Sequence, residues 1–595
     1  MGGYILGDTA AFGRTHREKI LPRLMNLRPL AVGILIGALG LSSATEGAAQ
    51  GTAGAFLAAR EAGMRNDMAR AIPYLERILR TNPDNLGALE NASVSAFSIG
   101  EYDRAAEHAA HLAALDPSNR AAALILLAEA FQSEDYATAL AITEGEVEIH
   151  PLLDELARAW AHMGEGRMSE ALDLLDELSS QPGMAAFARY CRALALSLVG
   201  DVEGALAIIE APEDGVAQTL NRRGYHAYAQ LLGLSQRFDD ALDLIDAVFA
   251  GSTDAGVAAM RAAYEAENAL PFDLITTPAE GMAEVLAVMA NAIRSAQNPH
   301  EALIYAHAAV RVNPALTDAQ LMIGQILEDL GQPEQALDAY ASIPEGDGFS
   351  MAARMGQAQV LETLGDMEAA IAELTDLAAE HPQSHVAVQV LGDFQRRDTQ
   401  FDAAITSYTQ AFALMEAQGI SPNWQTWFSR AVAYERSRRW PEAEADFRAA
   451  LEIEPNQATV LNYLGYSLVE RGESLDEALE MIERAVAAEP DSGYITDSLA
   501  WALFRLGRYE EAVPHMERAV ELEPTDPILN DHLGDVYWVV GRQREARFQW
   551  RRALSFGPSE DMNSELIYRK LDIGLEAARE EFDEPPLRLA PADTE

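Results

Sequence analysis

Residues 424–455 read WQTWFSRAVAYERSRRWPEAEADFRAALEIEP, and their pattern recurs through the last third of the chain. Ala443 of this stretch recurs as Ala478, Ala512 and Ala546, at intervals of 34 or 35 residues. A proline stands 12 residues after each of these alanines, and a small residue stands about 12 residues before each. The prolines are Pro455, Pro490, Pro524 and Pro558, and the small residues are Ala431, Gly465, Ala500 and Gly534. A fixed period near 34 residues indicates one supersecondary unit copied in series.

Each period predicts two helices joined by a short turn. Two apolar runs at helical spacing are separated at Arg438, Gly472, Gly507 or Gly541. The small residues let the two helices approach closely, and the proline ends the second helix. Because one unit cannot bury its apolar faces alone, neighbouring units must stack. The sequence therefore predicts an all-α solenoid.

The pattern resembles the tetratricopeptide repeat family. In the first unit quoted, the family's signature positions hold Trp427, Ala431, Tyr434, Trp440, Ala443, Phe447, Ala450 and Pro455. The resemblance implies a right-handed superhelix whose concave face, lined by the first helix of each unit, binds peptides or proteins.

The same register continues upstream, and it suggests how the chain is divided. Ala71 and Pro83 keep the spacing, as do Ala302 and Pro314. The spacing breaks between residues 241 and 302, which indicates either a degenerate repeat or a joint between two lobes. We expect an export segment at 1–50, an N-terminal lobe of degenerate repeats at 51–265, middle repeats at 266–412, a linker at 413–423, regular C-terminal repeats at 424–577 and a disordered acidic tail at 578–595.

Composition excludes some partners and much chemistry. The net charge of −49 argues against nucleic acid, which requires a basic surface. It fits either a solvated acidic exterior or a basic partner. The single cysteine, Cys191, excludes an intrachain disulfide. His108 and His111 lack the spacing and the nearby acid of a zinc site. We therefore expect no enzyme activity, no metal and no cofactor, and the oligomeric state stays open.

Residues between the signature positions are the candidates for binding a partner. In this family, five positions of each first helix face the groove. The resemblance places Tyr466, Trp501, Phe504 and Trp538 there as an aromatic ladder across three adjacent units. The full predicted partner-binding set is Phe428, Tyr466, Tyr494, Asp497, Trp501, Phe504, Arg505, Asp535 and Trp538. Such aromatic and polar residues suit an extended or helical peptide. The alternative is that Trp501 and Trp538 pack between neighbouring first helices.

A narrower resemblance suggests a cellular role. Residues Pro490–Leu554 are similar to the C-terminal repeats of large envelope tetratricopeptide proteins of Gram-negative bacteria. Some of those are outer-membrane lipoproteins that act as adaptors for carboxyl-terminal-processing proteases. The resemblance implies a non-catalytic periplasmic scaffold, with such an adaptor as one concrete version. The alternative is an assembly factor for an envelope polysaccharide or cell-wall complex.

The N-terminal residues carry the pattern of a bacterial export signal. Arg23 and Arg28 precede an apolar run from Pro29 to Leu41, and small residues follow. Met25 would give a signal of ordinary length, so it is a candidate true start. No cysteine follows the apolar run, so no lipid anchor is expected. The pattern predicts a periplasmic protein; if the segment is not cleaved, the alternative is an inner-membrane anchor.

N-terminal sequencing of the exported protein tests this expectation. If a signal peptidase removes the apolar run, the mature chain should begin between Thr45 and Gly51. A mature chain that still begins at Met1 would contradict the cleavage and favour the membrane anchor.

Overall fold

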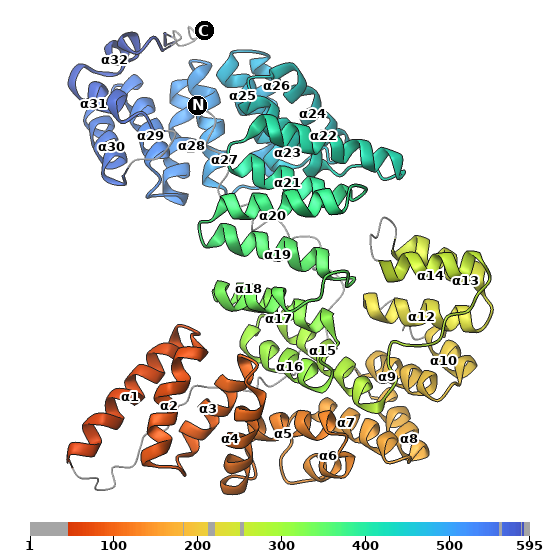
Figure 1. Cartoon of the computed structure of the whole chain (residues 1–595). Helices are drawn as coiled ribbons and strands as arrows, with labels where there is room; N and C mark the ends of the chain where they lie inside the picture. The colour runs from red at the N-terminus through yellow and green to blue at the C-terminus, as the bar shows by residue number, and fades with distance from the viewer. Residues whose placement is uncertain are drawn as a thin grey trace. The chain divides into compact units, whose positions relative to one another are not determined.

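The computed structural model describes residues 46–181, 184–211, 220–249, 255–557, 562–584 and 586–587. These residues form α-helices joined by short turns, and none of them lies in a β-strand (Figure 1). Residues 1–45 of the expected export segment, Pro558 and residues 588–595 of the expected tail lie outside the described part. Among the described helices, none has the length and apolar character needed to cross a membrane.

The predicted helix–turn–helix units are present in the C-terminal part of the chain. The pairs are α23 (Trp424–Arg436) with α24 (Trp440–Ile453), α25 (Ala458–Arg471) with α26 (Leu475–Ala488), α27 (Gly493–Arg505) with α28 (Tyr509–Leu522), and α29 (Pro527–Val539) with α30 (Gln543–Ser555). Each pair turns at a residue in the left-handed region: φ is 61° at Arg438, 70° at Gly472, 78° at Gly507 and 81° at Gly541. The four turn positions predicted from the sequence are thereby confirmed.

Small residues sit where the two helices of a unit cross. Ala443, Ala478, Ala512 and Ala546 are fully buried. At Gly534, a Cβ would collide with the ring of Trp550 on the second helix. The absence of a side chain on α29 therefore makes room for a large ring on α30.

The chain forms two compact units that divide between Ala387 and Val388. This division differs from the expected boundary at 265/266. The first unit contains α1 (Glu46–Met64), α2 (Met68–Thr81), α3 (Leu86–Ser98), α4 (Tyr102–Leu115), α5 (Arg120–Gln132), α6 (Tyr136–Thr143), α7 (Pro151–Gly164), α8 (Met168–Ser179), α9 (Ala185–Leu198), α10 (Val202–Ile209), α12 (Arg222–Leu234), α13 (Phe238–Val248), α14 (Ala255–Glu265), α15 (Pro278–Ser295), α16 (Pro299–Val312), α17 (Thr317–Asp329), α18 (Pro333–Ala341), α19 (Ser350–Thr363) and α20 (Met367–Glu380).

The second unit begins within α21 (His385–Arg397) and continues with α22 (Phe401–Ala417). Helix α22 takes in residues 413–417, so only the second half of the expected linker is non-helical. After α30 come α31 (Ser564–Ile573) and α32 (Leu575–Glu581), and α32 includes the first residues of the expected tail. A helix can continue at both places because no proline interrupts it there.

The break in the repeat spacing coincides with a change in how the first unit packs. Helix α15 packs against α5, α7 and α9, and α16 packs against α3 and α5 (Figure 1). These partners precede α15 by several repeats in the sequence. The interval before Ala302 therefore carries the chain back onto its own earlier helices.

Two glutamates of α15 and α16 are buried in this contact. Glu284 is 2% exposed and Glu301 is 8% exposed. Burial raises the pKa of Glu301 from 4.5 to about 7. Burial also raises the pKa of Glu284 to about 7, although Arg223 acts in the opposite direction. Both carboxyl groups therefore take up a proton at a higher pH in the folded state than in the unfolded chain.

The stability of the first unit should therefore depend on pH. Since the pKa of Glu301 is higher in the folded than in the unfolded chain, its contribution is greatest below pH 4.5 and is lost as the pH rises through about 7. Urea unfolding of the full chain between pH 5 and pH 8 should show this decline. The decline should be smaller in Glu301→Gln and unchanged in Glu107→Gln, an exposed position of the same unit. Equal pH profiles for wild type and Glu301→Gln would contradict the assignment.

Candidate functional site

The first helices of the C-terminal repeats lie next to one another. Helix α25 contacts α27, and α27 contacts α29. In the described residues, no two of the second helices α24, α26, α28 and α30 approach each other as closely, although Arg448 of α24 forms an ion pair with Glu477 of α26. Because the first helices approach more closely, they line the inner side of this part of the solenoid.

The structure divides the predicted binding residues into two groups. Four of them are buried: Asp497 (3% exposed), Trp501 (7%), Phe504 (2%) and Asp535 (1%). Five are partly exposed: Phe428, Tyr466, Tyr494, Arg505 and Trp538. The residues of the first group serve the packing of the unit, and those of the second group each leave part of the side chain exposed to solvent.

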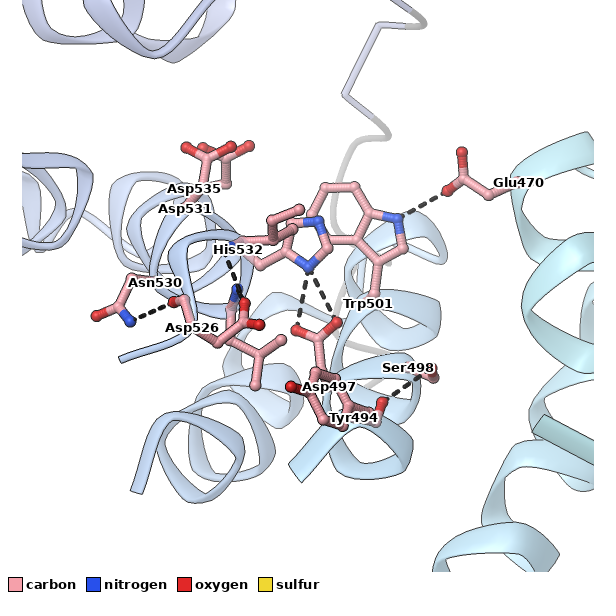
Figure 2. Close-up of polar contacts among 12 residues, drawn as sticks. Glu470, Tyr494, Asp497, Ser498, Trp501, Asp526, Asn530, Asp531, His532 and Asp535 are labelled. Atoms are coloured by element: carbon pink, nitrogen blue, oxygen red, sulfur yellow. Dashed lines mark hydrogen bonds and ion pairs between the residues drawn. The ribbon is translucent and has the colours of Figure 1, made fainter. Parts of the chain in front are cut away.

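Trp501 is held between neighbouring first helices, which is the packing alternative raised by the sequence. Its ring stacks on Phe504 with centroids 4.8 Å apart and on His532 of α29 with centroids 4.0 Å apart. Its Nε1 donates to Glu470 Oε1 of α25 over 2.8 Å (Figure 2). Arg505 Nη1 donates to the same carboxylate oxygen over 2.8 Å. One ring thus joins three repeats.

His532 is stacked on a ring and also paired with a carboxylate. Its Nδ1 lies 3.0 and 3.1 Å from the two carboxylate oxygens of Asp497 (Figure 2). Burial in itself lowers the pKa of His532, but the carboxylate of Asp497 and those of its neighbours on α29 outweigh burial and raise it. The higher pKa favours an imidazolium, and a cation stacked on an indole ring is further stabilised.

Lys570 of α31 forms a buried ion cluster with α29. Its Nζ donates to both carboxylate oxygens of Asp531 over 2.9 Å and to Asp535 over 2.8 Å. Trp550 Nε1 donates to the same Asp535 over 2.9 Å. The Lys570 side chain is only 3% exposed. Burial in itself lowers the pKa of Lys570, but the two aspartates outweigh it and raise the pKa. The ammonium group therefore stays charged and ties the last helices to the repeats.

The remaining rings of the predicted ladder lie in different surroundings. Trp538 lies against Trp550, with ring centroids 5.3 Å apart, and its Nε1 donates to Glu576 of α32 over 2.8 Å. Phe428, a predicted binding residue outside the ladder, lies edge-on to Tyr463, with ring centroids 5.6 Å apart. The structure therefore does not bring the four ladder rings into one continuous stack, although Trp501 and Phe504 are in direct contact.

Three polar pairs in this region share one geometry. Glu470 with Arg505, Asp497 with His532, and Asp535 with Lys570 are each 35 residues apart. Each pair therefore joins equivalent positions of two successive units. Neither His532 nor Lys570 belongs to the binding set predicted from the sequence. The signal that could have found both is an acid exactly one repeat upstream on the same face.

No metal or nucleophilic chemistry is apparent in the described residues. Within them, no group of three or more His, Cys, Asp or Glu side chains could hold a metal ion. Cys191 is 1% exposed, and burial raises the pKa of its thiol well above the usual range. The chemistry available on the inner side is contact by rings and charged groups.

Replacing Lys570 tests the buried ion cluster. In Lys570→Met, Asp531 and Asp535 keep their burial but lose their cation, which should cost about 3–5 kcal/mol and lower the Tm of the second unit by roughly 6–20 °C. Arg569→Ala is the control, because that neighbouring residue forms an exposed pair with Glu581 and should change the Tm little. Thermal unfolding by circular dichroism measures both. A Tm equal to that of the control would contradict the cluster's role.

Models of the tetratricopeptide repeat match five segments of the chain. One matches residues 56–120, 288–350 and 464–527, a second matches 424–457 and a third matches 352–384. The matched segments lie in both compact units. In the C-terminal part of the chain they cover residues 424–457 and 464–527, and they leave out the repeat formed by α29 and α30.

Two curated proteins share part of the sequence. TPR repeat-containing protein PA4667 of Pseudomonas aeruginosa is 26% identical over 198 residues, which is 32% of this chain and 31% of that protein. Bacteriophage adsorption protein A of Escherichia coli K12 is 34% identical over 93 residues, which is 16% of this chain and 9% of that protein. The chain therefore matches less than a third of the length of either relative.

Several solved structures are also similar, at low identity. The Cut9–Hcn1 structure is 14% identical with a TM-score of 0.38, over 89% of this chain and 97% of that one. A tetratricopeptide repeat protein of Parabacteroides merdae is 15% identical with a TM-score of 0.36, over 44% and 98%. The sequence matches and the helix–turn–helix units observed here agree, and both compact units contain tetratricopeptide repeats.

Proposed function

We propose that this protein is a non-catalytic scaffold of the bacterial periplasm that binds protein partners along the inner side of residues 424–577. Tetratricopeptide repeats support protein–protein interaction, and proteins built from them are generally non-catalytic. In its most concrete form, the proposal is an adaptor that brings a protein substrate to an envelope protease.

One observation carries the proposal. Partly exposed rings lie on the first helices of consecutive repeats. The side chains beside them are held in position by hydrogen bonds, ion pairs and ring contacts. Tyr466 lies on α25 and Tyr494 on α27, and Arg505 is paired with Glu470 beside the buried Trp501. Rings and arginine supply most of the binding energy in protein interfaces, and a rigid support lowers the entropy lost on binding. The repeat signature does not require these residues, so their presence favours a binding role.

The burial of Trp501 favours a protein partner over a glycan. A sugar stacks on the open face of an aromatic ring, whereas Trp501 is 7% exposed and stacks on Phe504 and His532. Chaperone-binding members of the tetratricopeptide repeat family hold the C-terminal carboxylate of a partner with lysine and asparagine side chains. That binding mode lacks support here, because no lysine lies on α23, α25, α27 or α29. Contacts along the body of a peptide or helix remain the best match.

The envelope location rests on the export pattern and on the relatives. One relative is named for the adsorption of a bacteriophage, which takes place at the cell surface, although the match covers 9% of that protein. The similarity of residues 490–554 to envelope adaptor proteins supports the same compartment. The protease partner is the most specific part of the proposal and needs a direct test.

A crosslinking pull-down of the full chain from the periplasm tests the proposal. Truncating Trp501 would unsettle the fold, because it is buried, so the test uses the partly exposed Tyr466→Ala with Tyr494→Ala. Each lost interface ring costs about 2 kcal/mol or more at a hot spot, so partner recovery should fall at least about tenfold. The matched control truncates exposed apolar residues of second helices, Phe548→Ala with Ile453→Ala.

Mass spectrometry of the captured proteins distinguishes the outcomes. Partners lost from the tyrosine variant and kept by the control support binding on the inner side. A carboxyl-terminal-processing protease or its substrate among them supports the adaptor, whereas polysaccharide synthesis proteins in their place support the alternative. If the folded tyrosine variant keeps every partner, the proposed surface is wrong.

A further inference from the structure

The inner side of the first unit is covered by two helices of the same chain. Helices α3, α5, α7 and α9 are the first helices of successive N-terminal repeats and occupy the positions that line a tetratricopeptide groove. Helix α15 packs against α5, α7 and α9, and α16 packs against α3 and α5 (Figure 1). The pair α15–α16 thus lies where a partner helix would bind in an open groove.

Ion pairs and hydrogen bonds hold this pair in place. The guanidinium of Arg311 on α16 donates to both carboxylate oxygens of Glu129 on α5 over 2.8 Å. The Tyr102 hydroxyl and His307 Nδ1 lie 3.0 Å apart, a hydrogen-bond distance. Beyond the pair, the α17–α18 turn also reaches the start of the unit, where Asn66 Nδ2 donates to the Leu330 carbonyl over 3.2 Å. These contacts close the first unit on itself.

Helix α15 also packs closely against the ring of Trp160 on α7. A Cβ at Gly281 would collide with ring atoms Cη2, Cζ3 and Cζ2 of Trp160 on α7. Trp160 is 1% exposed. The glycine costs helix stability relative to alanine, so its presence inside α15 is explained by the close approach to the ring.

This contact nevertheless buries polar atoms that have no hydrogen-bond partner, which is unfavourable in a permanent protein core. The buried polar atoms at it that have no hydrogen-bond partner in the described part of the chain include these four: Asp154 Oδ1, Tyr190 Oη, Glu284 Oε2 and Tyr305 Oη. Two belong to the groove helices and two to α15 and α16. Each such atom typically costs about 1–3 kcal/mol. Water would form hydrogen bonds with all four atoms when the surfaces separate, so their burial weakens the contact.

We propose that α15–α16 is a built-in occupant of the N-terminal groove, and that the groove is open to a partner only after this pair has left it. The non-helical segment between α14 and α15, residues 266–277, would serve as the hinge. The partner that fits is a pair of helices that resembles α15–α16. It would have a small residue where Gly281 contacts Trp160, and an arginine that pairs with Glu129 as Arg311 does. This inference concerns the first unit and does not rest on the function proposed for the second.

Gly281→Ala should weaken the packing of α15 against α7 without weakening the helix itself. Alanine stabilises α15 as a helix, yet its methyl group cannot lie against Trp160. A synthetic, fluorescently labelled peptide of residues 278–312 is then added to the full-length protein. We expect it to bind Gly281→Ala at least about tenfold more tightly than wild type, in which the groove is already filled. Adding Trp160→Phe, which removes the colliding ring atoms, should restore wild-type behaviour.

Two matched controls complete the test. Gly54→Ala alters a helical glycine with open space around it and should behave as wild type. If Gly281→Ala does not fold, Arg311→Ala weakens the same contact, and its control is Arg294→Ala, whose partner Asp329 lies on α17 outside the groove. Fluorescence anisotropy measures binding, and small-angle X-ray scattering measures the expansion expected on opening. If folded Gly281→Ala or Arg311→Ala neither binds the peptide nor expands, α15–α16 is a fixed part of the core and the proposal is overturned.

Discussion

The two helices of each repeat cross at a side chain no larger than a methyl group, and the rest of the structure depends on this close approach. The second helix supplies a side chain whose size matches the space left by the first. Where α29 has Gly534, α30 has Trp550; where α25 has Gly465, α26 has Ile482. Such matched sizes give the interior density of a close-packed protein. The stacking of units and the exposure of the inner side both follow from this geometry.

A second constraint sets the order of the C-terminal units. Polar pairs 35 residues apart join equivalent positions of successive repeats, and no two of the pairs are chemically alike. Glu470 meets a guanidinium, Asp497 an imidazole and Asp535 an ammonium group. Removing one repeat would place each acid opposite a residue chosen for a different neighbour. Units that share a packing signature are therefore not interchangeable, and the specificity of their order lies in the residues between the signature positions.

The sequence predicts well what depends on neighbours in the chain. The turns at Arg438 and Gly472, the buried alanines and the helix pairs all follow from local spacing. The burial of Trp501 could not be predicted in the same way, because it depends on His532 in the next unit. The role of Lys570 could not be predicted either, because it requires two aspartates of α29 that only the fold brings beside it.

The packing of α15–α16 was the hardest feature to predict. Ala302 and Pro314 keep the repeat spacing, so the local pattern gives no sign that these helices contact α3–α9 rather than continue the stack. The sequence does show a disturbance before residue 302, but spacing alone cannot say where the chain goes. The position of α15 depends on surfaces that are far away in the sequence, such as the ring of Trp160. These surfaces form only when the helices that carry them have folded.

The order of the helices along the chain gives this packing a consequence for folding. The groove helices are complete at Leu198, whereas α15 begins at Pro278. At about 5–20 residues per second, the ribosome needs on the order of ten seconds to make the residues between them. During that interval the nascent chain presents an apolar surface whose natural cover has not yet been made. Until α15 and α16 are made, the first unit therefore leaves an apolar surface exposed to contact with other chains.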